Sequence, residues 1–178
     1  FTKINTNLNF NIEVTDALVF KKKLYIVFHR KDRDCKNVSI YETKLDSRNI
    51  NFEFQEFFEF GKAGKCDRAA FAGRIYNYEL NNQEGLLLSS VSFKDQNKEI
   101  LDQYGIRSEY KFSDIIFIDF KEKKFKKIAT GLKNPQGLVV IGNNIIASDH
   151  GPRGGDEINN IKLNKHYGWP YSSYGENY

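Results

Sequence analysis

Short segments with alternating apolar and polar residues recur along most of the chain. This period-2 pattern places successive side chains on opposite faces of a strand, so it predicts strands rather than helices. A polar segment at 31–37 separates the first two of them, and residues 97–104 have only a weak helical pattern that Gly105 ends. The predicted strands cover residues 24–29, 38–45, 51–60, 75–80, 86–93 and 114–120.

Turn sequences join these strands into hairpins. Gly-Asn-Asn at 142–144 predicts a tight turn between the apolar segments 138–141 and 145–148. A second turn is predicted at 121–124, within a run of mixed charge (121–127) that is typical of a solvent-exposed hairpin.

Many short strands joined by tight turns indicate a sandwich, a barrel or a propeller. A propeller blade takes ~40–50 residues, so this chain would hold roughly four blades. The repeat is too irregular to select among the three architectures, and the pattern by itself predicts an all-β domain.

Composition agrees with a sheet-rich fold and argues against two function classes. The 15 Phe and 10 Tyr favour pleated, half-buried surfaces. The net charge is +4, and the 27 basic residues are spread among 23 acidic ones, so no nucleic-acid surface is predicted. No run approaches the ~18 apolar residues of a membrane-spanning helix. No signal peptide is visible in this sequence, which contains no Met.

The two cysteines, Cys35 and Cys66, allow two interpretations. They form one disulfide in an exported protein, or they are two separate buried thiols. No His lies at metal-ligand spacing from either, so a cysteine-based zinc site is not predicted.

Residues 131–178 differ chemically from the rest of the chain. They contain all three prolines, the single Trp, two of the three His, and seven of the 13 Gly from Gly137 onward. Residues that restrict or relax the backbone torsion φ gather where a loop follows a specified path. Such loops on a rigid scaffold are where functional sites usually lie.

Three motifs in this region carry a resemblance to a known family. They are GLKNPQG at 131–137, HGPRGGDE at 150–157 and YGWP at 167–170, which SYGENY follows at 173–178. In this order they resemble the glucose/sorbosone dehydrogenases, most closely the soluble aldose sugar dehydrogenases that use pyrroloquinoline quinone (PQQ). The resemblance is strong over 131–178 and weaker back to about Ala70.

This resemblance implies both a fold and a function. The fold is a six-bladed β-propeller, and the chain would be a single, incomplete propeller domain over 1–178, with about four blades and a cofactor and calcium loop region at 131–178. The function is oxidation of an aldose to its lactone with PQQ and calcium, in the periplasm or outside the cell. A small sugar is the implied substrate, while its identity and the electron acceptor stay open.

Lys133 and Asn134 match the basic residue and Asn that contact PQQ in the family. PQQ is a flat quinone with three carboxylates, which calls for cationic and amide donors. The usual first residue is Arg, whose planar fork binds a carboxylate through two hydrogen bonds, whereas Lys offers a point charge. The alternative is a surface Lys beside an Asn that fixes the turn before Pro135.

Calcium takes oxygen ligands, including backbone carbonyls. In the family, the carbonyls of a Gly-Pro pair bind the calcium that polarises the quinone, and the matching residues are Gly151 and Pro152. A second, structural calcium is held partly by residues that match Glu157 and Tyr167. The alternative is a Gly-rich turn in which Asp156 caps the following element.

The general base of the family is a His in an upstream Asp-His-x-Gly-Gly-Arg pattern. It takes the proton of the sugar hydroxyl while hydride passes to the quinone. The best match is 69–74, where Gly73 and Arg74 fit, but Ala69 and Ala70 stand in the Asp and His positions. Alanine cannot accept a proton, so no catalytic residue is predicted.

Two functions therefore compete. The retained loops favour a sugar dehydrogenase, while Ala69 and Ala70 favour a catalytically silent propeller that binds a ligand or a protein. His150 borders the calcium loop and is not the expected base; His29 and His166 are expected to be ordinary surface or partly buried residues. Because an open propeller segment exposes strand edges, the functional protein is expected to be longer.

Overall fold

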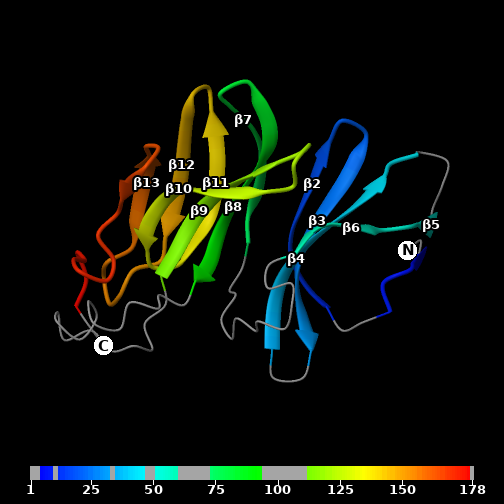
Figure 1. Cartoon of the computed structure of the whole chain (residues 1–178). Coiled ribbons are helices and arrows are strands. Elements are labelled where there is room, and N and C mark those ends of the chain that lie inside the picture. Colours follow the sequence, from blue (N-terminus) through cyan, green and yellow to red (C-terminus); the bar gives the residue numbers. More distant parts are fainter. Residues whose placement is uncertain are drawn as a thin grey trace.

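A computed structural model of the chain describes residues 5–9, 12–32, 35–46, 51–59, 73–93 and 112–176. Within these ranges every regular element is a β-strand, as the alternation predicted (Figure 1). The weak helical candidate at 97–104 and the Ala69–Ala70 pair lie outside the described residues.

Three sheets, each built on a meander of antiparallel strands, make up most of the described chain, and β14 adds one parallel strand to the second of them. In spatial order, the first sheet contains β2 (Ile12–Phe20), β3 (Lys23–Asp32), β4 (Cys35–Lys44) and β6 (Gln55–Glu59). The second contains β7 (Ile75–Leu80), β8 (Gln83–Phe93), β9 (Phe112–Asp119), β10 (Phe125–Leu132) and β14 (Lys165–His166). The third contains β11 (Pro135–Ile141), β12 (Asn144–Asp149) and β13 (Glu157–Ile161). A further two-stranded sheet pairs β1 (Asn5–Thr6) with β5 (Asn51–Phe52).

The second sheet is buried on both faces, and its sequence explains why. Leu86 and Leu88 of β8 join the apolar cluster shared with the first sheet, while Leu87 between them joins the cluster shared with the third. Strand β9 divides in the same way, with Ile116 and Ile118 in the first cluster and Ile115 and Phe117 in the second. A strand buried on both faces carries a continuous apolar run instead of an alternating one.

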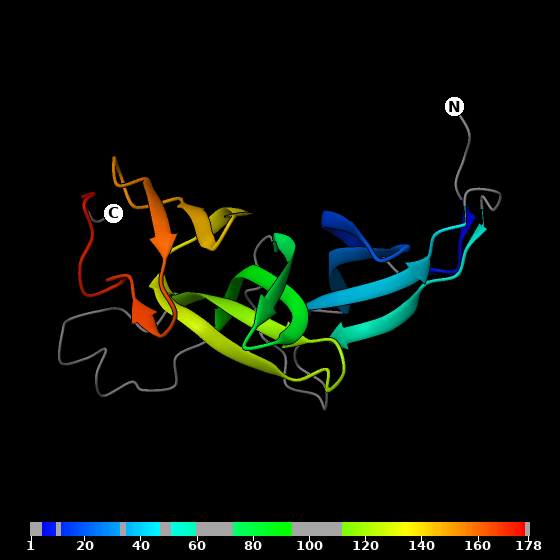
Figure 2. The ribbon, with the colours of Figure 1, turned by 90° about the horizontal axis from the view of Figure 1, so that it is seen from above.

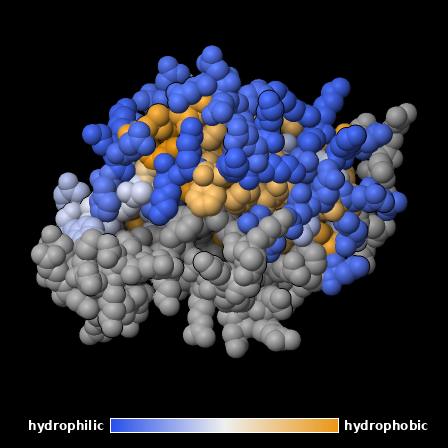
Figure 3. All heavy atoms as spheres, in the orientation of Figure 1, coloured by the Kyte–Doolittle hydropathy of each residue, from blue (hydrophilic) through white to orange (hydrophobic). Residues whose placement is uncertain are grey.

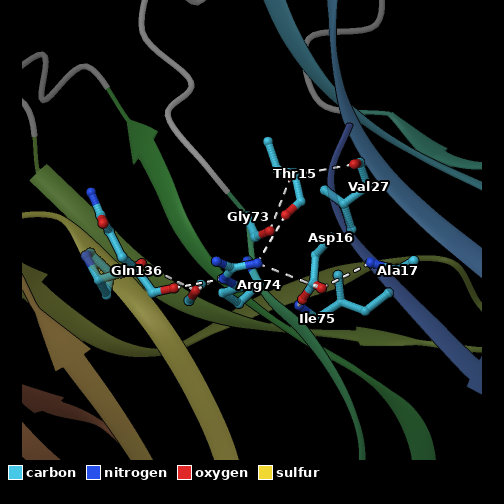
Figure 4. A network of polar contacts seen from close by, with 10 residues as sticks. Thr15, Asp16, Ala17, Val27, Gly73, Arg74, Ile75 and Gln136 are labelled. Carbon is cyan, nitrogen blue, oxygen red and sulfur yellow. Dashed lines mark hydrogen bonds and ion pairs between the residues drawn. The ribbon is translucent and has the colours of Figure 1, made fainter. Parts of the chain in front are cut away.

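The first strands of the three sheets lie next to one another, because β7 contacts both β2 and β11. Arg74, immediately before β7, joins all three. Its Nε donates to the carbonyl of Gln136 at 2.8 Å and its Nη1 to the carbonyl of Thr15 at 3.0 Å (Figure 4). Asp16 lies 3.7 Å from Nη1 and accepts a hydrogen bond from the backbone N–H of Ile75 at 2.9 Å.

Seen from above, the three sheets follow one another in chain order (Figure 2), and two apolar clusters fill the spaces between their faces. Successive meanders whose first strands are adjacent form a β-propeller segment, the architecture that the family resemblance implied. Three sheets of blade type and the small β1–β5 sheet stand where roughly four blades were expected. Apolar atoms also reach the surface over β11–β13 (Figure 3), where Ile141 and Ile158 are 64% and 82% exposed.

Both predicted hairpins are confirmed. Strands β11 and β12 pair from Ile141↔Asn144 outward, and β9 and β10 flank the turn at 121–124. The side chain of Asp119 fixes that second turn, since its Oδ1 accepts hydrogen bonds from the backbone N–H groups of Lys121 and Glu122 at 2.7 Å each. Residues 121–127 are exposed, as predicted for a solvated hairpin.

Two predicted segments differ from the structure in their boundaries. The turn predicted over residues 31–37 is shorter in the structure, because β3 and β4 remain paired as far as Asp32↔Cys35. The polar side chains there did not signal a strand, but backbone pairing does not require apolar side chains. The predicted strand 51–60 is split in two. At the break, the side chain of Asn7 replaces a neighbouring strand as the hydrogen-bond partner of the Phe54 backbone. Its Oδ1 accepts from the N–H of Phe54 and its Nδ2 donates to the carbonyl, both at 2.9 Å.

Strand β2 was not predicted at all. Thr15 and Asp16 interrupt its apolar pattern, and the pairing with β3 shifts register between Val14 and Asp16. A register shift changes which face each side chain occupies, so the period-2 signal is lost there.

Candidate functional site

Three loops meet beside the second and third sheets. The 131–137 loop is defined as the end of β10, the two linking residues 133–134 and the start of β11. The 150–157 loop comprises the link 150–156 and the first residue of β13, and the 167–176 segment follows β14. Strand β14 pairs in parallel with β10, which brings the third motif beside the first. The N–H of Tyr167 donates to the carbonyl of Thr130 at 2.8 Å, and that of Trp169 to the carbonyl of Gly131 at 2.9 Å.

Gly131 is required where these two segments touch. Its φ of +74° lies in the left-handed region, and a Cβ there would come within 2.3 Å of the ring of His166. Only glycine satisfies both conditions without strain. The first motif therefore begins with a glycine because the third motif packs directly against it.

Asp149, at the end of β12, organises the 131–137 loop. Only 6% of this residue is exposed, and its carboxylate accepts hydrogen bonds from the backbone N–H groups of Lys133 at 2.9 Å and Asn134 at 2.6 Å. Burial raises the pKa of Asp149, the two backbone hydrogen bonds oppose that rise, and the charge of Glu157 adds to it. The N–H of His150 donates to the carbonyl of Asn134 at 3.0 Å. Asp149 and His150 therefore both bind the backbone of the 131–137 loop.

The side chain of Lys133 crosses from the first loop to the second. Its Nζ donates to the carbonyl oxygen of Gly151 at 2.7 Å and lies 5.7 Å from the centre of the Trp169 ring. The ammonium is thus held by a backbone dipole on one side and an aromatic face on the other. The carbonyl of Lys133 accepts a hydrogen bond from Ser113 Oγ at 3.0 Å, which fixes the backbone beneath it.

The 150–157 loop turns so tightly that its glycines are in backbone contact. A Cβ on Gly151 would lie 1.8 Å from the carbonyl oxygen of Gly155. The N–H of Gly155 donates to the carbonyl of Pro152 at 2.8 Å. Asp156 accepts a hydrogen bond from the N–H of Gly151 at 3.1 Å and lies 3.1 Å from His150 Nδ1. Asp156 thus closes the loop by binding back to its first residues, His150 and Gly151.

Glu157 and Tyr167 line one open hollow of about 480 Å³. The Tyr167 hydroxyl donates to the carbonyl of Asn160 at 2.9 Å and accepts from the N–H of Lys162 at 2.7 Å. Glu157 Oε2 accepts from Asn159 Nδ2 at 3.0 Å. The complete lining is Glu157, Asn159, His166, Tyr167, Gly168, Ser172, Ser173 and Tyr174.

The donor chemistry of these loops fits a calcium ion and an anionic cofactor. No cluster of three His, Cys, Asp or Glu side chains able to hold a metal occurs in the described ranges, so a cation here would depend on carbonyl oxygens. The carbonyl of Gly151 already accepts a hydrogen bond from a cation, the Lys133 ammonium. Lys133 and Asn134 lie next to each other and are both partly exposed, so they can reach an anion that enters from solvent.

The structure brings the predicted residues together in two groups. Lys133 and Asn134 adjoin Gly151 through the contacts above, and Glu157 shares the hollow with Tyr167. Asp149 lies between the groups, since it bonds the first loop and pairs across β12 and β13 with Glu157. Sequence reasoning did not identify Asp149, because an acid between an apolar strand and a Gly-rich segment is also typical of an ordinary turn.

His166 matches the prediction of an ordinary surface histidine, whereas His29 is more buried than predicted. His29 lies in β3 and is buried, with 3% of its surface exposed. His166 is exposed, and its Nδ1 accepts a hydrogen bond from the N–H of Gly168 at 3.0 Å. The Gly73–Arg74 end of the upstream match is described and anchors the start of β7. Cys66 falls outside the described residues, so the cysteine alternatives stand as they were.

Comparisons with known proteins agree with this arrangement. Over 50 residues the chain is 48% identical to the aldose sugar dehydrogenase YliI of Escherichia coli (strain K12), which covers 27% of the chain and 14% of that relative. It is 44% identical over 50 residues to the uncharacterized Synechocystis sp. protein slr1608, covering 27% of the chain and 12% of that protein.

A solved structure of a glucose dehydrogenase shares the fold. It superimposes with a TM-score of 0.63 over 96% of this chain, at 20% sequence identity. The chain spans about half of that protein, 54% of its length. The family model described as Glucose / Sorbosone dehydrogenase matches residues 11–178, nearly the whole chain. The chain therefore belongs to the glucose/sorbosone dehydrogenase family.

Proposed function

We propose that the three loops form a site for PQQ and calcium, and that the protein acts as a sugar dehydrogenase-like quinoprotein. The observation that carries this proposal is the 2.7 Å contact between Lys133 Nζ and the carbonyl of Gly151. It joins Lys133 of the predicted cofactor-binding motif to Gly151 of the predicted calcium-binding motif, two residues that are 18 positions apart in the chain. Family membership and the named aldose sugar dehydrogenase relative support the same chemistry.

Each loop has a distinct task in this proposal. Lys133 and Asn134 bind the carboxylate rim of the cofactor, and Asp149 holds their backbone in place. The carbonyls of Gly151 and Pro152 bind the calcium that faces the cofactor, while Glu157 and Tyr167 contribute to a second calcium in their shared hollow. When bound, PQQ accepts the hydride of the sugar.

The dehydrogenase reaction needs a group that accepts the proton of the sugar hydroxyl, and the expected one is missing from the sequence pattern. Ala69 and Ala70 stand where the family pattern has Asp and His, and neither can accept the hydroxyl proton. This observation favours a second candidate, a propeller of the same superfamily that binds a ligand or protein without turnover. The two candidates share the loops and differ only in the upstream acid–base pair.

An activity assay separates these candidates. The protein is mixed with PQQ and excess calcium, and reduction of an electron-accepting dye is followed with a panel of aldoses. The dehydrogenase predicts turnover, and the binding module predicts quinone binding without turnover. The variant Ala70→His then restores a proton acceptor and is expected to raise dye reduction above the unmodified protein. Loss of both quinone binding and turnover would contradict the proposal.

The family resemblance also suggests the setting of the reaction. The proposed substrate is a small aldose, the proposed product its lactone, and the proposed location the periplasm or the cell exterior. Within the described ranges, the structure has no helix of the length and apolar character that crossing a membrane requires. The 131–178 region is the proposed cofactor and calcium portion of the propeller.

A further inference from the structure

We propose that Lys133 and a divalent cation compete for the carbonyl oxygen of Gly151, so that calcium binding releases the Lys133 ammonium for an anionic ligand. This inference rests on the proposed calcium site and deepens it. It assigns to one residue two successive partners, a backbone carbonyl and then an anion.

The carbonyl of Gly151 is held in a fixed direction. Gly151 is buried, its N–H donates to Asp156 Oδ1 at 3.1 Å, and its Cα lies against the backbone of Gly155. A fixed carbonyl cannot turn away when its partner changes. A carbonyl oxygen has two lone pairs, so a cation that uses this one must come close to the Lys133 ammonium.

The two cations cannot share the oxygen at low cost. Calcium lies ~2.3–2.6 Å from its oxygen ligands, and Nζ already lies 2.7 Å from this one. Two positive charges on one carbonyl would repel each other at short range, in a half-buried position where water screens them weakly. Binding of calcium therefore displaces Nζ.

The backbone of Lys133 stays in place when its side chain moves. Its N–H is held by Asp149 and its carbonyl by Ser113. The Trp169 ring, with its centre 5.7 Å from Nζ, offers the released ammonium an aromatic face close to its first position. The displaced Lys133 ammonium therefore remains near the 131–137 loop, beside Asn134.

A released ammonium next to a divalent cation favours a multiply charged anion. Calcium binding thus strengthens anion binding, and by linkage the anion strengthens calcium binding by the same factor. Lys suits this exchange better than Arg, because a single flexible point charge leaves a carbonyl more readily than a planar guanidinium that makes several hydrogen bonds.

Calorimetric titration with calcium chloride alone, without quinone, tests the competition. Lys133→Met retains the apolar stem of the side chain and removes the ammonium. We expect it to bind calcium on the order of tenfold more tightly than the matching protein that retains Lys133. Lys162→Met, which removes an exposed lysine, controls for net charge and is expected to leave the affinity unchanged. All proteins carry Glu157→Gln, so that the second calcium position does not contribute.

A labelling experiment provides an independent readout on the unmodified protein. Reductive methylation of lysines is quantified by mass spectrometry with and without calcium, and methylation of Lys133 is expected to rise with calcium while that of Lys162 stays constant. Equal calcium affinities with and without Lys133→Met in the Glu157→Gln background, or unchanged labelling at saturating calcium, would overturn the competition and leave the calcium site intact. Absence of calcium binding in every variant would overturn the calcium site and the competition together.

Discussion

At the residue scale, Asp149 and Gly151 determine the geometry of the proposed site. Asp149 accepts hydrogen bonds from the backbone N–H groups of Lys133 and Asn134. Gly151 has no side chain, so the backbone of Gly155 in the same loop can pack directly against it. The motif residues could be found from the sequence because Lys, Asn, Gly and Pro in this order are specific. Asp149 could not, since an acid after an apolar strand is also common in turns. Its burial is a property of the packed loops.

The contact at Gly151 predicts that a single methyl group there opens the loop. Gly151→Ala is expected to cost about 3 kcal/mol of unfolding free energy, because backbone atoms must separate to accommodate the Cβ. Gly142→Ala is the matched control. A Cβ there meets open space, and only the positive φ of 58° opposes it, so the expected cost is about 1 kcal/mol. Urea unfolding of both variants gives the comparison, and equal costs would refute the tight turn.

At the scale of elements, the strands follow from residue patterns wherever a strand has one consistent environment. The hairpins at 121–124 and 142–144 were predicted because turn residues and apolar segments agree there. Strand β2 was not, because its polar Thr15 and Asp16 face neighbouring strands instead of solvent: Thr15 Oγ1 donates to the carbonyl of Gly73 at 3.1 Å, and Asp16 bonds Ile75. Polar contacts between sheets have no period that a sequence reveals.

The pairing of β3 with β4 predicts a specific loss of stability at alkaline pH. Burial raises the pKa of Tyr25 above its ordinary value of 10.0, and the charge of Glu42 and its hydrogen bond add to that rise. The folded protein therefore keeps this proton longer than the unfolded chain, so stability falls as pH increases above 10. Tyr25→Phe removes the effect and should flatten the decline by up to about 1.4 kcal/mol per pH unit. Urea unfolding from pH 9 to 11 checks this, and parallel declines would contradict it.

At the scale of the whole molecule, the chain is a row of blade-type sheets whose first strands are tied together by Arg74. The continuous apolar runs of β8 and β9 indicated burial, but they could not say which sheets lie on either side. Packing of Leu87 against one sheet and its neighbours against the other requires the full topology. The all-β class was therefore predictable from composition and alternation, while the propeller arrangement needed the motifs at 131–178.

The contacts of Arg74 predict that its side chain stabilises the packing of the three sheets. Arg74→Met removes the hydrogen bonds to Thr15 and Gln136 and is expected to lower the unfolding free energy by about 1–2 kcal/mol, a reduced value because the arginine is partly exposed. Arg153→Met is the control, an exposed arginine that bonds Glu176 through its backbone carbonyl, and should change stability by less than about 0.5 kcal/mol. Thermal and urea unfolding measure both, and a neutral Arg74→Met would show that the sheets pack without this tie.

The central claim is that the three loops bind PQQ and calcium as one site, and the single tryptophan tests it most directly. Trp169 lies beside the Lys133 ammonium, so its fluorescence reports on that site. Titration with PQQ in the presence of calcium should quench it saturably, and omission of calcium should weaken binding. Lys133→Met should lower the affinity for PQQ about tenfold or more, as expected for loss of one charge-assisted contact, whereas Lys162→Met should leave it unchanged. Quenching that does not saturate, or equal affinities for Lys133→Met and the unmodified protein, would contradict the account.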